Sequence, residues 1–186
     1  MNPIGKSEKL MFIDLLRTRR SIRKYQKKTV EKEKIDILIE AALRSFSSRN
    51  SQPLEFVAVT ERDTLARLAD AKTSGSAFLK DAPLAIVVCA DTTKSDVWIE
   101  DASIAATLLH LTAADIGLGS CWIQIRLRQR DPHQSASAYV ASILGIREGL
   151  EVEAIVAIGY PTEHKEPQTA SSLKYETIRR EHYGKP

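Results

Sequence analysis

The sequence predicts a layered domain in which helices cover both faces of a β-sheet. Two apolar runs of strand length, LAIVVCA at 84–90 and VEAIVAIGYP at 152–161, alternate along the chain with segments of helical periodicity. The chain has 186 residues, of which 43% are hydrophobic and 27% are charged, so we expect one domain, 1–186, with a packed core. The pattern by itself is compatible with a parallel or a mixed sheet.

The first half of the chain shows two clear helical patterns. Apolar residues recur three and four positions apart in 12–18 and in 31–44, so each segment is expected to bury one face. Residues 45–53, SFSSRNSQP, are rich in Ser, Asn and Pro and therefore predict a loop. The alternating segment EFVAVT at 55–60 then predicts a strand, and a short helix is expected at 63–72.

The second half is predicted to contain further strands and helices. The run at 84–90 is apolar throughout, which suits a strand that is buried on both faces. The segment 98–116 is rich in Ala and Leu on all sides and predicts a central helix. Shorter helices are expected at 134–144 and 171–182, and the polar, basic residues from about 162 onward are expected to form a C-terminal arm.

The composition argues against several classes of protein. No run of about 18 apolar residues occurs, and residues 1–10 lack the apolar stretch of a secretory signal, so we expect a cytoplasmic protein without a membrane partner. Cys89 and Cys121 are too few for a disulfide scaffold and are expected to be reduced, buried thiols. The four histidines are scattered and the cysteines lack zinc spacing, so no metal site is expected. The motifs of serine hydrolases and P-loop proteins are absent.

The strongest charge asymmetry lies near the start of the chain. The net charge is only +3, but residues 17–28, RTRRSIRKYQKK, contain seven basic residues and no acid. Such a run is either a solvated surface or an anion site. If the run is extended, Arg19, Ser21 and Arg23 share one face, where two guanidinium groups and a hydroxyl form a phosphate cradle to which Arg20 adds charge.

Two further segments have polar or glycine-rich character. The loop at 47–53 is dense in side-chain donors and acceptors, which by itself indicates ordinary turn chemistry. Gly117 and Gly119 follow a helix instead of opening one, which argues against a dinucleotide-binding loop of the Rossmann type. The glycines permit a sharp exit from the helix, and extended backbone after that exit can aim peptide N–H groups at a flat ligand.

Taken in order, these segments resemble the nitroreductase family of flavin mononucleotide (FMN) enzymes over nearly the whole chain. The likeness is carried by RRSIRKY at 19–25, SSRNSQP at 47–53, DAPLAIVVCAD at 81–91, EDASIAATLLHLTAADIGLGSCWI at 100–123 and AIGYP at 157–161. The resemblance implies an α+β fold, namely a three-layer α/β/α sandwich with a mixed central sheet. It also implies a homodimer in which the active site is built across the two-fold axis.

The resemblance assigns the phosphate contacts of the flavin to the basic segment. Arg19, Arg20 and Ser21 would hold the FMN phosphate, and Arg23 would reach either that phosphate or the pyrimidine edge of the ring. Lys165, which follows the GYP turn, matches a region that often supplies a further phosphate charge.

Two other groups of flavin contacts follow from the same resemblance. The polar contacts that family members deliver from the opposite subunit correspond to Ser47, Ser48 and Asn50. The segment whose backbone lies along the flavin ring corresponds to Trp122, Ile123 and Gln124. The peptide N–H of Gln124 would then be directed at flavin N5. Family members often have Gly where Gln124 stands and Trp where Leu54 stands, and these departures bear on substrate choice more than on flavin binding.

The function that the resemblance implies is that of an FMN-dependent NAD(P)H oxidoreductase. Hydride would pass from NADH or NADPH to flavin N5, and a nitroaromatic, quinone or similar flat acceptor would then replace the nucleotide in a ping-pong cycle. No catalytic side chain is required, in agreement with the missing catalytic motifs. Two alternatives stay open: a non-catalytic flavin carrier or sensor, and a nucleic-acid-binding module that uses 17–28, where Tyr25 alone offers an aromatic ring.

Overall fold

The computed structural model describes residues 11–184. The helices are α1 (Phe12–Thr18), α2 (Lys32–Leu43), α3 (Arg62–Ala69), α4 (Trp98–Asp115) and α5 (Ala136–Leu144). The strands are β1 (Leu54–Val59), β2 (Leu84–Asp91), β3 (Gly119–Gln124), β4 (Gln129–Asp131), β5 (Gln134–Ser135) and β6 (Leu150–Gly159). Short 3₁₀ turns lie at Ser48–Asn50, Ala77–Asp81, Ala170–Ser172 and Tyr175–Thr177. None of the helices between residues 11 and 184 combines the length and the apolar surface that crossing a membrane requires.

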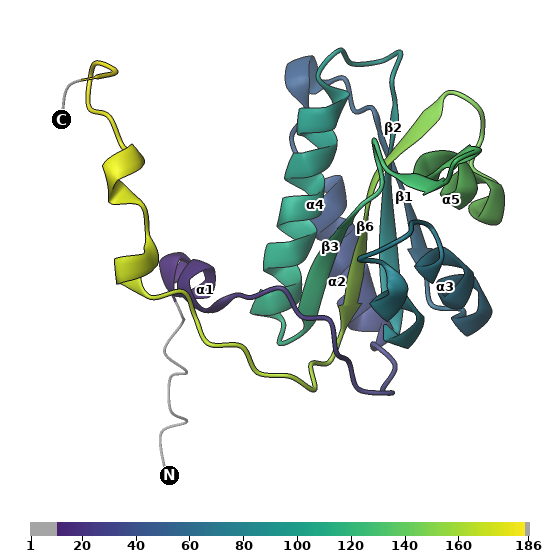
Figure 1. Cartoon of the computed structure of the whole chain (residues 1–186), viewed down its shortest axis with the longest axis horizontal. Helices are drawn as coiled ribbons and strands as arrows, with labels where there is room; N and C mark the ends of the chain where they lie inside the picture. Colours follow the sequence, from purple (N-terminus) through teal and green to yellow (C-terminus); the bar gives the residue numbers. More distant parts are fainter. Residues whose placement is uncertain (1–10, 185–186) are drawn as a thin grey trace, which may run out of the picture.

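The elements form three layers (Figure 1). The middle layer is a four-stranded sheet in the order β1-β2-β6-β3, so β1 and β3 are its edges. Helices α2 and α4 cover one face of the sheet, and α3 and α5 cover the other. The expectation of an α+β fold with a three-layer α/β/α arrangement is therefore confirmed.

The four strands of the sheet pair in the antiparallel sense throughout, and one parallel bridge joins the sheet from outside these strands. All pairs of neighbouring strands, β1 with β2, β2 with β6, and β6 with β3, are antiparallel. The parallel pairing comes from an isolated bridge between Ser21 and Ser120 at the edge of β3. The basic segment near the start of the chain therefore joins the sheet, and it does so beside the strand that follows the glycine exit.

The apolar runs seen in the sequence reflect burial on both faces of the sheet. Every residue of β2 is buried. Along this strand, Ile86 packs in the cluster that includes α2 and α4, whereas its neighbour Val87 packs in the cluster that includes α3 and α5. Because successive strand residues point to opposite faces, a strand between two helical layers must be apolar throughout.

A glycine at the end of β6 allows the N-terminal segment to approach the sheet closely. A Cβ atom at Gly159 would lie 2.5 Å from Cδ of Pro83 and 3.0 Å from Cδ1 of Tyr25, so a larger residue would displace both rings. Tyr25 is consequently buried, with 8% of its surface exposed. The glycine in AIGYP therefore helps to hold the basic segment against the ends of β6 and β3.

In the second half of the chain, one expected helix is wrong and one hairpin was not expected. The helix expected at 171–182 is replaced by two separate 3₁₀ turns. The residues of this segment are exposed, so no apolar face is buried to offset the entropy that helix formation costs. The sequence pattern also does not predict the short hairpin of β4 and β5, which precedes α5.

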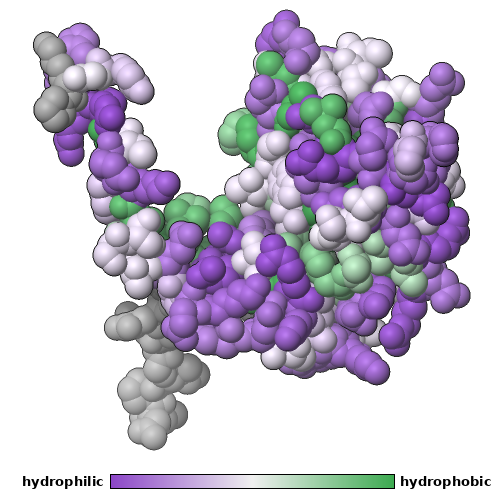
Figure 2. Space-filling model, viewed as in Figure 1, coloured by the Kyte–Doolittle hydropathy of each residue, from purple (hydrophilic) through white to green (hydrophobic). Residues whose placement is uncertain are grey.

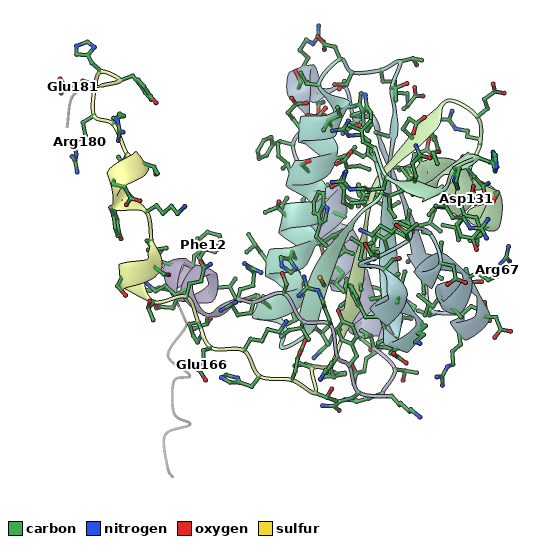
Figure 3. All side chains as sticks on the ribbon, viewed as in Figure 1. Phe12, Arg67, Asp131, Glu166, Arg180 and Glu181 are labelled. Carbon is green, nitrogen blue, oxygen red and sulfur yellow. The ribbon has the colours of Figure 1, made fainter. Side chains whose placement is uncertain are left out.

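The apolar stripe of α1 is not buried within the chain, contrary to expectation. Phe12 is 63% exposed and Leu16 is 42% exposed. Figure 2 shows hydrophobic surface where α1 meets the C-terminal arm, and Figure 3 shows Phe12 on α1 beside this arm. The described part of the arm, from residue 162 onward, extends away from the three layers (Figure 1). An apolar helix face and a projecting arm therefore lie together at one side of the molecule.

Candidate functional site

A cavity of about 500 Å³ lies between the basic segment, α1 and the start of the arm. Its lining residues are Ile13, Leu16, Arg17, Arg19, Arg20, Ser21, Arg23, Lys165, Gln168 and Leu173. The structure thus brings together the whole predicted phosphate cradle, Arg19, Arg20, Ser21, Arg23 and Lys165. Lys165 is more than 140 residues away from the others in sequence, and only the return of the chain after β6 places it here.

The backbone holds the basic segment in an extended path along the end of the sheet. The N–H of Ile22 donates to the carbonyl of Ser120 at 2.9 Å, and the N–H of Gln26 donates to the carbonyl of Tyr160 at 2.8 Å. The side chains of Ile22 and Tyr25 point into the core, where burial raises the pKa of the Tyr25 phenol. Because the path is extended, the polar residues that alternate with Ile22 face the cavity.

The first residues of the arm close the cavity from the other side. Lys165 donates from Nζ to the carbonyl of Ser21 at 2.8 Å, and Arg20 donates to the carbonyl of Glu166. The N–H of Arg23 donates to Oε1 of Glu163 at 2.6 Å, which is the main reason why the pKa of Glu163 is lowered. Sequence reasoning missed Glu163. Its carboxylate accepts from the backbone N–H of Arg23 and leaves the guanidinium of Arg23 available.

His110 connects the cradle to the central helix, a role that the sequence analysis did not foresee. Its Nε2 lies 2.6 Å from Nη1 of Arg19, and its Nδ1 is hydrogen-bonded to the hydroxyl of Ser120. Because a guanidinium can only donate, Nε2 must accept and Nδ1 must carry the proton. Burial and the charge of Arg19 lower the pKa of His110 to about 4, so the ring is neutral at pH 7.

The predicted ring-binding segment forms the edge strand β3. The side chain of Ile123 is 1% exposed and belongs to the core, so this side chain does not face the open edge. The carbonyl of Ser120 points away from β6 toward Ile22. Since orientation alternates along an antiparallel strand, the N–H groups of Trp122 and Gln124 also point away from β6. This is the orientation that a peptide donor to a flat ligand needs.

A buried carboxylate fixes the far end of this edge. Glu153, which is 3% exposed, accepts from Nε2 of Gln124 at 3.0 Å and from Nε of Arg126 at 2.8 Å. Oε1 of Gln124 in turn accepts from Nε1 of Trp122 at 2.9 Å. The side chain of Gln124 is therefore used for structure, and the sequence analysis did not single out Glu153, its partner.

The predicted polar contacts Ser47, Ser48 and Asn50 do not join the cradle within one chain. The N–H of Ser48 donates to Oδ1 of Asp101 at 2.9 Å, at the first turn of α4. The cradle lies toward the opposite end of this helix (Figure 1), whose 18 residues span ~27 Å at 1.5 Å per residue. Asp101 is buried, and its hydrogen bond orients this loop.

Sequence reasoning also missed Lys72, a lysine near β3. Lys72 and Arg128 line a pocket of about 400 Å³ between the segment after α3 and the hairpin. Partial burial is the main cause that lowers the pKa of Lys72, and the charge of Arg128 is the second cause.

Cys121 lies on β3 and is 2% exposed. Burial raises the pKa of its thiol, which fits the expected inert cysteine.

We predict that His110 makes the free energy of unfolding depend on pH. Its pKa is about 4 in the folded chain and about 6.5 when unfolded, so the unfolded state takes up the proton first as the pH falls. The stability that the neutral ring contributes is complete above pH 6.5 and is lost toward pH 4, by at most about 3 kcal/mol. In His110→Gln the fall between pH 6.5 and pH 4 should be smaller, as measured by urea unfolding at several pH values.

The matched control is His133→Gln, because His133 is exposed on the turn between β4 and β5. This variant should retain the pH dependence of the unmodified protein. An identical pH dependence in His110→Gln would show that the Arg19–His110–Ser120 contacts do not hold the ring neutral.

Comparisons with known proteins agree with the geometry. The model of the nitroreductase family matches residues 16–160. An FMN-dependent nitroreductase structure from Clostridium difficile has 45% sequence identity and a TM-score of 0.91, with coverage of 92% of this chain and 99% of the other. A relative from Archaeoglobus fulgidus, provisionally named NADH dehydrogenase/NAD(P)H nitroreductase, is 34% identical over 83% of this chain and 87% of its own length. A Thermus thermophilus NADH dehydrogenase is 28% identical over 80% of this chain and 86% of its own length. From the family match and these similarities, the chain belongs to the nitroreductase family of oxidoreductases.

Proposed function

We propose that the protein is an FMN-dependent NAD(P)H oxidoreductase that reduces nitroaromatics, quinones or similar flat acceptors. The observation that carries this proposal is the assembly of Arg19, Arg20, Ser21, Arg23 and Lys165 around one cavity. When bound, FMN supplies hydride-transfer chemistry at N5, which permits a ping-pong exchange between a reduced nicotinamide and an acceptor. The two free, buried cysteines fit the reducing cytoplasm in which we expect the reaction.

The residues of the cavity suit a phosphate monoester. Arginine forms bidentate, charge-assisted hydrogen bonds to phosphate oxygens, and a serine hydroxyl adds a short donor. Arg19 is held by His110, and Lys165 by the carbonyl of Ser21, so these cations are in place before a ligand arrives. This preorganisation reduces the entropy that is lost on binding.

The remaining contacts suit a flat ring at the edge of β3. The outward N–H of Gln124 can donate to a ring nitrogen, and the buried Glu153 keeps that part of the backbone in position. Arg23, which lines the cavity, can stabilise negative charge at a pyrimidine edge. These groups bind and orient the cofactor, and none acts as a nucleophile.

The site is proposed to be completed by a second copy of the chain. Within one chain, Ser47, Ser48 and Asn50 lie at the opposite end of α4 from the cradle. The exposed apolar face of α1 and the projecting arm also offer surface that a second copy can cover. A two-fold dimer would use each of these features, because both copies would contribute and receive the same contacts.

We predict that the purified protein is yellow and that NADH or NADPH bleaches it under anaerobic conditions. Addition of a nitroaromatic or a quinone should restore the absorption, because electrons leave the cofactor only when an acceptor arrives. A carrier or sensor would be yellow but would not bleach with nicotinamide nucleotides. Protein that stays colourless after incubation with FMN would contradict the assignment and favour the nucleic-acid-binding alternative, which would show binding that falls steeply with salt.

Replacing two cradle arginines should deplete the flavin without unfolding the chain. Arg19→Ala with Arg23→Ala removes two charge-assisted contacts, and at about 1.5 kcal/mol or more each the FMN affinity should fall roughly 100-fold or more. The ratio of flavin to protein absorbance and the far-ultraviolet circular dichroism measure the two effects. The control, Lys32→Ala with Arg67→Ala, removes two exposed cations outside the cavity. Full flavin occupancy in the Arg19/Arg23 variant would refute the cradle.

Light scattering should give about twice the chain mass of 20.7 kDa for the flavin-loaded protein. The expectation follows from the separation of the Ser47 loop and the cradle within one chain. A monomer that retains FMN tightly would contradict the shared site while leaving the cradle itself intact.

A further inference from the structure

A second, strongly basic pocket adjoins the candidate flavin cavity. It has a volume of about 250 Å³ and lies where the basic segment meets the start of α3 and the turn before β2. Charged side chains dominate its lining, namely Arg23, Lys24, Lys27, Arg62, Lys80 and Asp81. Arg23 lines both cavities, so the two are neighbours. The function proposed above does not use the other residues of this pocket.

The rim of this pocket carries a large excess of positive charge. Five cations, Arg23, Lys24, Lys27, Arg62 and Lys80, surround it, with Asp81 as its one carboxylate. Across residues 11–184, the side chains of these five cations form no ion pair. Like charges that converge without partners repel one another, and an anionic ligand with several charges would relieve this repulsion.

The floor of the pocket is apolar. Tyr25, Ala82 and Pro83 contribute to it, and the first two are 8% and 4% exposed. The close approach of Pro83 and Tyr25 to Gly159 holds both rings against the end of β6. A flat heterocycle can pack on such a floor while phosphate groups meet the cations above it. An apolar floor under a cationic rim therefore suits a nucleotide better than a simple anion.

We propose that this pocket binds the phosphorylated adenosine end of NADPH and thereby selects NADPH over NADH. The inference rests on the proposed function, because it requires the nicotinamide end of the same molecule to reach the flavin ring, whose pyrimidine edge Arg23 is proposed to contact. NADH and NADPH share the pyrophosphate, but only NADPH carries a 2′-phosphate, which adds about two negative charges at pH 7. With the negative charge of Asp81 subtracted from the five cations, the pocket keeps four positive charges. This is more than neutralisation of the pyrophosphate alone requires.

Two arginines of α3 provide a matched pair of variants. Arg62 is the first residue of the helix and lines the pocket, whereas Arg67 lies near its last turn, outside the pocket, on the outer side of the molecule (Figure 3). The unmodified protein should have a KM for NADPH roughly tenfold below its KM for NADH. Arg62→Ala should raise the KM for NADPH roughly fivefold and change the KM for NADH less than about twofold, while Arg67→Ala changes neither.

Binding without turnover gives a second readout. Adenosine 2′,5′-bisphosphate should inhibit competitively against NADPH, and calorimetric titration should show that Arg62→Ala weakens its binding roughly fivefold, with Arg67→Ala unchanged. Non-competitive inhibition would indicate an anion site separate from the nucleotide path and would overturn the inference. So would equal KM values for NADH and NADPH in the unmodified protein, or an equal effect of Arg62→Ala on both.

The same experiments test the oxidoreductase assignment separately from the selection of NADPH. If both nucleotides bleach the flavin with equal KM values, the oxidoreductase assignment stands and only the selection of NADPH fails. If neither nucleotide bleaches a yellow protein, the oxidoreductase assignment fails, and the NADPH inference, which rests on it, is overturned as well.

Discussion

The parallel bridge between Ser21 and Ser120 is the contact on which the candidate site depends. It attaches the basic segment to the edge of β3 in an extended form, so that its polar side chains face a cavity in place of open solvent. Lys165 then donates to the carbonyl of Ser21 and closes that cavity from the arm. The cations of this segment repel one another, so backbone hydrogen bonds, each worth about 1 kcal/mol net, and the burial of Ile22 and Tyr25 must hold them together.

Neutral and acidic partners make this concentration of positive charge tolerable. His110 orients Arg19 without adding a charge, because burial and the neighbouring guanidinium keep the imidazole unprotonated at neutral pH. Glu163 compensates part of the charge through Lys165 and anchors the backbone of Arg23. The site therefore combines the exposed guanidinium of Arg23 with supporting residues that hydrogen bonds hold in place. This arrangement favours a strong but geometrically selective interaction with phosphate.

The two basic cavities differ in how firmly their cations are held, and this difference matches the proposed ligands. Arg19 and Lys165 are partly buried and each is held by a hydrogen bond, which suits a cofactor that stays bound. Lys27, Arg62 and Lys80 are exposed around a firm apolar floor, which suits a nucleotide that must leave after each turnover. Exposed charges of this kind raise association rates more than they prolong residence.

The layers, and the order of the basic, polar and glycine-rich segments, can be predicted from the amino-acid sequence. Local periodicity was sufficient for α4, β2 and β6, because a buried strand or helix must be apolar on every face it buries. Periodicity failed at 171–182, where a helical pattern has nothing to pack against. The roles of His110, Glu153 and Glu163 become visible in the folded chain alone, as does the distance between Ser48 and the cradle of its own chain. These roles arise from contacts between residues distant along the chain, which neither composition nor spacing encodes.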